Sequence, residues 1–255
     1  ILLVFGNTSE ERHCERFHQF WRGTVAYMTR GPEDVYDDAA VNAWIQDDPD
    51  PATRAELTEL LSAAGSHGER AQAARRALND AFSGTLAFGT AGLRGRLGGG
   101  PNRMNRVVVI RAAAGLSAYL KARLGEGFSV VIGYDARHNS EQFARDTAAV
   151  VTGAGGRAIL FESHCPTPVL AFALRRLEAD AGVMVTASHN PPQDNGYKVY
   201  LGGRAVTDSG QGAQIVPPYD SQIAAAIDAV GPVGSVPRPQ SGWETVDPEI
   251  REEYI

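Results

Sequence analysis

The strongest constraint on the fold is a regular alternation of helical and strand-like segments between residues 106 and 186. Apolar residues at helical spacing alternate with short apolar runs, and only short loops separate them. This order is typical of βαβ units, in which a helix joins two parallel strands. We therefore predict an α/β fold, a three-layer α/β/α domain with a mainly parallel mixed sheet. The expected helices cover residues 106–124, 140–152 and 167–177, and the expected strands cover residues 128–134, 157–161 and 181–186.

The segments on either side of this alternation differ from it in composition. Residues 37–82 show helical spacing with breakers between the runs, which predicts a helical N-terminal segment that packs on the domain. Residues 1–36 show no period and are expected to be an irregular N-terminal extension. We expect the α/β domain to cover residues 83–230. Residues 231–255 are expected to be a linker and the start of a truncated second domain.

Three smaller expectations concern single segments. We predict a short strand at residues 212–216 and a helix with proline near its start at residues 217–230. Asn139, directly before Ser140, is the expected cap of the helix at residues 140–152. His13, Cys14 and His18 could form half of a metal site, but a zinc site needs further ligands at defined spacing, so an incidental cluster is the favoured interpretation.

Composition excludes several classes of function. The formal net charge of −6 argues against a nucleic-acid partner, because phosphate backbones require clustered Lys and Arg. Two cysteines imply no disulfide framework and favour a cytoplasmic location. No apolar run approaches the roughly 20 residues that cross a bilayer, so no membrane partner is expected.

The stretch from residue 182 to residue 200 combines two apolar runs with a polar loop between them. Pro191 and Pro192 fix φ and offer no amide donor, so the loop cannot extend the strand before it. Ser188 and His189 are therefore expected at the end or edge of a sheet, where a ligand could reach them. A serine hydrolase is disfavoured, because sequence neighbours at a strand end point apart and no Gly-x-Ser-x-Gly elbow is present.

Phosphoryl chemistry is the other functional interpretation of this loop. Phosphoryl transfer depends on positioning and charge, so a serine near Arg94, Lys198 and His189 is chemically suitable. Arg94 follows the glycine-rich residues 84–93, and it could form either a surface ion pair or a phosphate clamp. From the residues alone, a purely structural loop stays ahead of phosphoryl transfer.

The turn at residues 133–140 also follows a predicted strand and precedes a helix. Such turns bind ligands in open α/β sheets, but a structural pair between Asp135 and Arg137 that holds the turn is favoured.

These motifs resemble a known family. The runs Thr-Ala-Ser-His-Asn-Pro (residues 186–191) and Asn-Gly-Tyr-Lys (residues 195–198) resemble the phosphoserine loop of the α-D-phosphohexomutases, which include phosphoglucomutases and phosphomannomutases. The runs Phe-Gly-Thr-Ala-Gly-Leu-Arg-Gly (residues 88–95) and Gly-Tyr-Asp-Ala-Arg (residues 133–137) resemble two further motifs of this family, in the same order. The likeness covers residues 37–230, and it looks most like the bacterial phosphomannomutase and phosphoglucomutase-2 branch.

The resemblance implies a mechanism and roles by position. Ser188 would carry a phosphoryl group, donate it to a hexose monophosphate to give a bound 1,6-bisphosphate, and take back the other phosphate. The phosphorylated Ser188 would also help to bind Mg²⁺. Thr90, Arg94 and Lys198 would bind the phosphosugar substrate, and His189 or Lys198 would act as general acid or base.

One departure from the family affects the expected activity. Complete members have four domains, and the metal loop with its aspartates lies in a later domain; no Asp-x-Asp-x-Arg run occurs here. We therefore expect an N-terminal part of a phosphohexomutase that is inactive alone. The alternatives are a non-enzymatic sugar-phosphate-binding or regulatory module, and phosphopentomutase specificity.

Overall fold

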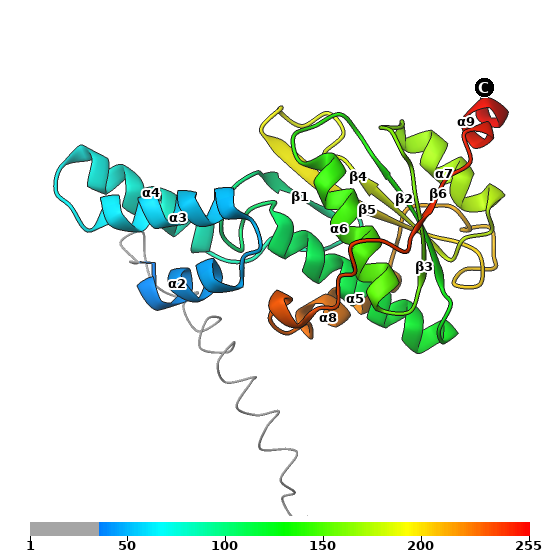
Figure 1. Cartoon of the computed structure of the whole chain (residues 1–255), viewed down its shortest axis with the longest axis horizontal. Helices are drawn as coiled ribbons and strands as arrows, with labels where there is room; N and C mark the ends of the chain where they lie inside the picture. The colour runs from blue at the N-terminus through cyan, green and yellow to red at the C-terminus, as the bar shows by residue number, and fades with distance from the viewer. Residues whose placement is uncertain (1–35) are drawn as a thin grey trace, which may run out of the picture.

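The computed structural model describes residues 36–255, and a six-stranded sheet lies at its centre (Figure 1). The strand order is β1-β5-β4-β2-β3-β6. The strands are β1 (Leu93–Arg96), β2 (Ser129–Tyr134), β3 (Arg157–Leu160), β4 (Ala181–Val185), β5 (Asp194–Leu201) and β6 (Glu244–Thr245). Strands β4, β2, β3 and β6 pair in parallel, whereas β5 is antiparallel to both β4 and β1. The predicted mainly parallel mixed sheet is confirmed.

Helices cover both faces of this sheet, which gives the predicted three layers. The helices of the domain are α5 (Arg106–Leu124), α6 (Ser140–Gly153), α7 (Thr167–Arg176), α8 (Tyr219–Asp228) and α9 (Glu249–Tyr254), with a 3₁₀ turn, η1 (Val233–Ser235). Helices α5, α6 and α8 enclose the main apolar core with one face of β2 and β4. Helices α7 and α9 cover the other face, where Val131, Met184 and Tyr200 point. Successive side chains along a strand point to opposite faces of the sheet, so the two faces carry two separate apolar cores.

The predicted helical lead-in consists of three helices that stand to one side of the sheet (blue to cyan in Figure 1). They are α2 (Asp38–Asp47), α3 (Pro51–Ala64) and α4 (Glu69–Phe82). The side chains of Asp37 and Asp50 cap α2 and α3 by accepting the amides of Ala39 and Ala52 at 2.9 Å.

Two carboxylates attach the lead-in to the α/β domain. Asp47 accepts the backbone amides of Val233 and Gly234 at 2.8 and 2.9 Å, and Glu56 accepts the amide of Gly99 at 3.0 Å. The lead-in is therefore packed on the domain, as its apolar spacing indicated.

Two local predictions were wrong. Residues 212–216 do not form a strand, because only Gln214 makes a bridge, to Tyr200, before the chain turns away. Asn139 precedes α6 as expected, but it has a left-handed φ of 65° and its side chain makes no capping hydrogen bond. The cluster of His13, Cys14 and His18 lies outside the described residues. Among residues 36–255, no helix combines the length and apolarity that a membrane span requires.

Candidate functional site

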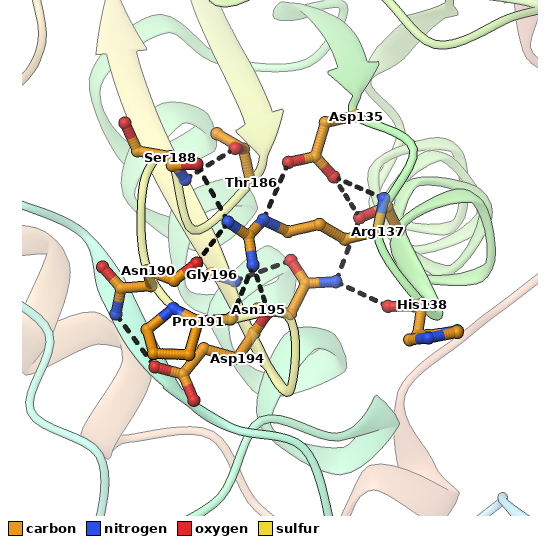
Figure 2. A network of polar contacts seen from close by, with 11 residues as sticks. Asp135, Arg137, His138, Thr186, Ser188, Asn190, Pro191, Asp194, Asn195 and Gly196 are labelled. Atoms are coloured by element: carbon orange, nitrogen blue, oxygen red, sulfur yellow. Dashed lines mark hydrogen bonds and ion pairs between the residues drawn. The ribbon is translucent and has the colours of Figure 1, made fainter.

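Two loops begin side by side because β2 and β4 are parallel neighbours. Their last residues, Tyr134 and Val185, are paired in register. The carboxyl ends of parallel strands lie at one edge of a sheet, where open α/β folds bind ligands. The loop of residues 135–139 and the loop of residues 186–193 therefore start next to each other (Figure 2).

Backbone hydrogen bonds fold the second loop tightly. The amide of Thr186 donates to the carbonyl of Gly196 at 3.0 Å, so the loop closes at its base. The amide of Asn190 donates to Ala187 at 3.1 Å, and the amide of Asp194 donates to Pro191 at 3.0 Å. With the two prolines in addition, little freedom remains in the loop.

Ser188 lies at the tip of this loop with an unusual backbone conformation. Its φ is 60°, in the left-handed region that costs a residue with a side chain about 1–3 kcal/mol. Its amide donates to the hydroxyl of Thr186 at 2.9 Å, and its carbonyl accepts a hydrogen bond from Arg137 at 2.9 Å. The residue is exposed, and its hydroxyl points away from Arg137 (Figure 2). The backbone of Ser188 is held on both sides while its side chain faces outward.

His189 is exposed next to Ser188. Among residues 36–255, no hydrogen bond joins the side chains of Ser188 and His189. This geometry contains no nucleophile and base pair of the hydrolase kind.

A buried asparagine ties the two loops together. Asn195 is fully buried, and its Nδ2 donates to the carbonyl of His138 at 2.8 Å and to the hydroxyl of Ser140 at 3.0 Å. Its Oδ1 accepts the amide of Gly196 at 2.7 Å. Asp135 accepts the same Ser140 hydroxyl at 2.7 Å and faces the Arg137 guanidinium at 3.3 Å. The favoured structural pair of Asp135 and Arg137 is present, but sequence reasoning did not foresee the link through Asn195.

Arg94 and Lys198 lie on adjacent strands and on the same face of the sheet. Arg94 pairs in register with Gly196, and Lys198 lies two residues further along β5. Lys198 is 8% exposed. Burial lowers the pKa of Lys198, and the charge of Arg94 lowers it further, while Asp135 acts in the opposite direction.

Neither of these cations is neutralised by a contact. Within residues 36–255, neither side chain forms an ion pair with a carboxylate, and the buried Nε of Arg94 finds no acceptor. Two cations close together without a carboxylate partner are costly unless an anion binds, so the pair favours an anionic ligand.

Gly196 gives Arg94 the space to lie across β5. A Cβ at Gly196 would be 2.6 Å from the carbonyl oxygen of Thr186 and 2.7 Å from that of Leu93, with Cγ of Arg94 at 3.1 Å. Only glycine fits at this close approach of three chain segments.

Thr90 is placed differently from the other predicted site residues. It is exposed in the loop before β1, and its carbonyl accepts a hydrogen bond from Gln214 at 2.6 Å. The structure thus brings Ser188 and His189 to the end of β4 and places Arg94 and Lys198 together on the adjoining strands. Among the described residues, no hydrogen bond joins Thr90 to any of these four.

A metal site cannot be assembled from acidic, histidine and cysteine side chains of the described chain. No group of three or more such residues gathers within residues 36–255. Cys165 is buried, and burial raises the pKa of its thiol to about 11, which keeps it protonated and unreactive.

Comparison with known proteins identifies relatives with one common kind of activity in their names. The family description "Phosphoglucomutase/phosphomannomutase, alpha/beta/alpha domain I" matches residues 85–231. A Haemophilus influenzae protein named "Probable phosphomannomutase" is 51% identical over 154 residues, which are 60% of this chain and 30% of that protein. The Saccharomyces cerevisiae phosphoribomutase is 38% identical over 201 residues, which are 78% of this chain and 29% of the enzyme.

A solved structure agrees with this match. A Thermus thermophilus protein, assigned as a phosphomannomutase, superimposes with a TM-score of 0.54 and 31% identity over 67% of this chain and 35% of its own. The chain spans about three tenths of the length of the two curated relatives described above.

Proposed function

Because the chain belongs to the phosphoglucomutase/phosphomannomutase family, we propose that it carries the phosphoserine of a phosphomutase that interconverts a hexose 1-phosphate and a hexose 6-phosphate. The observation that carries this proposal is the geometry of Ser188. Its backbone is held in the left-handed region by Thr186 and Arg137, and its hydroxyl is exposed. Such a residue can present a phosphoryl group to a sugar without a change in its own conformation.

The reaction divides into two phosphoryl transfers. In the first transfer the P–O bond to Ser188 breaks, a P–O bond forms to the free hydroxyl of the sugar monophosphate, and a sugar 1,6-bisphosphate results. The proton of that hydroxyl passes through the general acid or base to the leaving oxygen of Ser188. The bisphosphate turns over, the hydroxyl oxygen of Ser188 accepts the other phosphoryl group, and its proton passes to the sugar oxygen that is released. The P–O bond to the serine and a P–O bond to the sugar thus exchange in each step, with no net gain or loss of phosphate.

The nearby cations have separate tasks in this proposal. Arg94 and Lys198 neutralise phosphate oxygens, since neither has a carboxylate partner among the described residues. Lys198 can also exchange a proton, because burial and Arg94 lower its pKa. His189, exposed beside Ser188, is the second candidate acid or base, and Thr90 is proposed to contact the substrate.

Mg²⁺ is proposed as the metal, with phosphorylated Ser188 as one hard oxygen ligand. Within residues 36–255 no three His, Cys, Asp or Glu side chains gather at one place, so further ligands of the ion are proposed to come from outside these residues. We propose for the same reason that the 255-residue chain alone does not turn over substrate. A cytoplasmic location is proposed on a different ground, the two cysteines that imply no disulfide framework.

A pentose phosphate is the second candidate substrate. It is favoured by the names of two relatives, the Saccharomyces cerevisiae phosphoribomutase and the Mus musculus phosphopentomutase, which is 36% identical over 193 residues. Rates with mannose, glucose and ribose 1-phosphates, measured on the protein as its gene encodes it, distinguish the substrates.

The proposal is tested by Ser188→Ala in the same assay. We expect it to abolish conversion with every sugar phosphate, because no other residue accepts the phosphoryl group. The matched control is Ser209→Ala, an exposed serine in a loop beyond β5. Full activity in Ser188→Ala contradicts the proposal. Tight calorimetric binding of glucose 1,6-bisphosphate by the 255-residue chain, without mutase activity of the gene product, instead favours the non-enzymatic module.

A further inference from the structure

The guanidinium of Arg137 lies in the middle of the phosphoserine loop, residues 186–194 (Figure 2). Nη1 donates to the carbonyls of Pro191 at 2.8 Å and Asp194 at 3.0 Å. Nη2 donates to the carbonyls of Ser188 at 2.9 Å and Asn190 at 2.7 Å.

The remaining N–H group, on Nε, faces Oδ2 of Asp135 at 3.3 Å. A guanidinium has five N–H donors, and here each has an oxygen within reach. Asp135 also accepts the backbone amide of Arg137 at 3.0 Å and the hydroxyl of Ser140 at 2.7 Å, so the carboxylate that orients the arginine is itself fixed.

The hydrogen bonds and the ion pair of Arg137 are partly shielded from water. The side chain of Arg137 is 16% exposed and that of Asp135 is 24% exposed. Hydrogen bonds from a charged donor are stronger than neutral ones, and partial burial limits competition from water.

The loop depends on this cation because four of its carbonyl groups converge on one point. Without a donor there, the carbonyl dipoles of Ser188, Asn190, Pro191 and Asp194 would repel one another, and some would be left without a partner. The direction of the Ser188 carbonyl fixes the peptide plane after it. That plane, together with the bond from the Ser188 amide to Thr186, sets the backbone angles from which the hydroxyl points outward.

We infer that Arg137 is a positioning residue for Ser188: it does not touch the reacting atoms, but it holds the loop in the one arrangement that presents the serine for phosphoryl transfer. The inference rests on the proposed function for its catalytic part. Its structural part, that Arg137 orders residues 186–194, stands independently.

Lysine cannot replace arginine here. An ammonium group has three donors and no plane, so at least two of the five oxygens would lose their partner. Arg137→Lys therefore separates a need for positive charge from a need for the planar group. Arg137→Ala leaves a space into which free guanidinium ion could bind.

The experiment compares Arg137→Lys, Arg137→Met and Arg137→Ala with the wild type in the protein as its gene encodes it. The control is Arg145→Met, because Arg145 also lies near the start of α6 but is 52% exposed and forms its ion pair with Glu141. Three quantities are measured: amide hydrogen exchange of residues 186–194, the rate at which glucose 1,6-bisphosphate phosphorylates Ser188, and kcat and KM for the sugar monophosphate.

In Arg137→Met we expect faster exchange at the amides of Asn190 and Asp194, and a loss of phosphorylation rate on the order of 100-fold, as is typical for a misplaced reacting group. The loss should fall on kcat rather than on KM, and Arg137→Lys should retain only part of the rate. Guanidinium at concentrations that do not unfold the protein should restore activity to Arg137→Ala but not to Ser188→Ala. Arg145→Met should behave as the wild type.

Wild-type exchange and phosphorylation in a folded Arg137→Met overturns the inference. If Arg137→Met does not fold, Arg137→Lys decides, because a wild-type rate in that variant contradicts the need for a planar five-donor group. If wild-type Ser188 never becomes phosphorylated, the proposed function fails, and the exchange data still decide whether Arg137 holds the loop.

Discussion

The hydroxyl of Thr186 accepts the backbone amide of Ser188 at 2.9 Å, across a single intervening residue. This short contact turns the chain at the end of β4, and Ser188 takes a positive φ directly after it. Thr186 is 4% exposed, so water competes poorly for the bond. The threonine is therefore part of the structure that presents Ser188.

Thr186→Val keeps the shape of the side chain but removes the acceptor. We expect the free energy of unfolding to fall by about 1 kcal/mol, the net value of one hydrogen bond, and the phosphorylation of Ser188 to slow. Thr186→Ser keeps the hydroxyl and should keep the phosphorylation rate. Chemical denaturation and a phosphorylation time course measure the two effects. Equal phosphorylation rates in the valine and serine variants would show that the hydroxyl has no role.

Gly196→Ala tests the close approach of β1, β4 and β5 beside Arg94. Because the added Cβ would meet two carbonyl oxygens at 2.6 and 2.7 Å, we expect a loss of about 1–3 kcal/mol in the free energy of unfolding. Gly231→Ala is the matched control, since a Cβ at Gly231 has no heavy atom within 4 Å. It should change stability by no more than about 0.5 kcal/mol. Similar losses in both variants contradict the crowding described at Gly196.

Lys198→Met removes a buried cation with a lowered pKa. Between that lowered pKa and the unfolded value of about 10.4, the unfolded chain binds more protons than the folded one. The free energy of unfolding of the wild type therefore rises with pH across this window. Any excess of the free energy of unfolding of Lys198→Met over that of the wild type should be largest below the lowered pKa. The excess should shrink as the pH rises from the lowered pKa toward the unfolded value. Denaturation at several pH values measures this difference, and a constant difference contradicts the burial effect.

The same substitution should impair function. Loss of one preorganised cation costs on the order of 100-fold in transfer rate, so mutase activity should fall by about that factor. Lys121→Met, whose side chain is 46% exposed and paired with Glu126, should retain activity. Wild-type activity in Lys198→Met would remove this residue from the site.

The layers of the fold could be predicted because apolar spacing reports which side of an element is buried. The spacing in residues 106–124 and the apolar run before Tyr134 correspond to α5 and β2 within a few residues. The prediction of a short strand at residues 212–216 was wrong, because this segment pairs with β5 through one bridge only, at Gln214. The spacing of apolar residues carries no information on where the pairing with a neighbouring strand ends.

The candidate site could be predicted only in part, because several of its contacts depend on backbone groups and on strand register. A hydroxyl group and cations suit phosphate, so Ser188, Arg94 and Lys198 could be named as candidates from their chemistry. Only the resemblance to the phosphohexomutases placed phosphoryl transfer ahead of a purely structural loop. The hydrogen bonds from Arg137 to this loop could not be predicted, because the main acceptors are backbone carbonyls of Ser188 and its neighbours. Every sequence contains such carbonyl groups. Asn195 was missed as a link because its contacts, to His138 and Ser140, depend on the parallel register of β2 and β4.

The phosphorylation state of Ser188 tests the proposed phosphoryl transfer most directly. The protein is incubated with glucose 1,6-bisphosphate, digested, and analysed by tandem mass spectrometry, before and after addition of a sugar monophosphate. We expect a phosphate-sized mass increase located on Ser188. When the monophosphate is added, the phosphate should leave the protein and appear on the sugar. Conversion of sugar phosphates with no phosphate ever detected on Ser188 would contradict the proposed transfer.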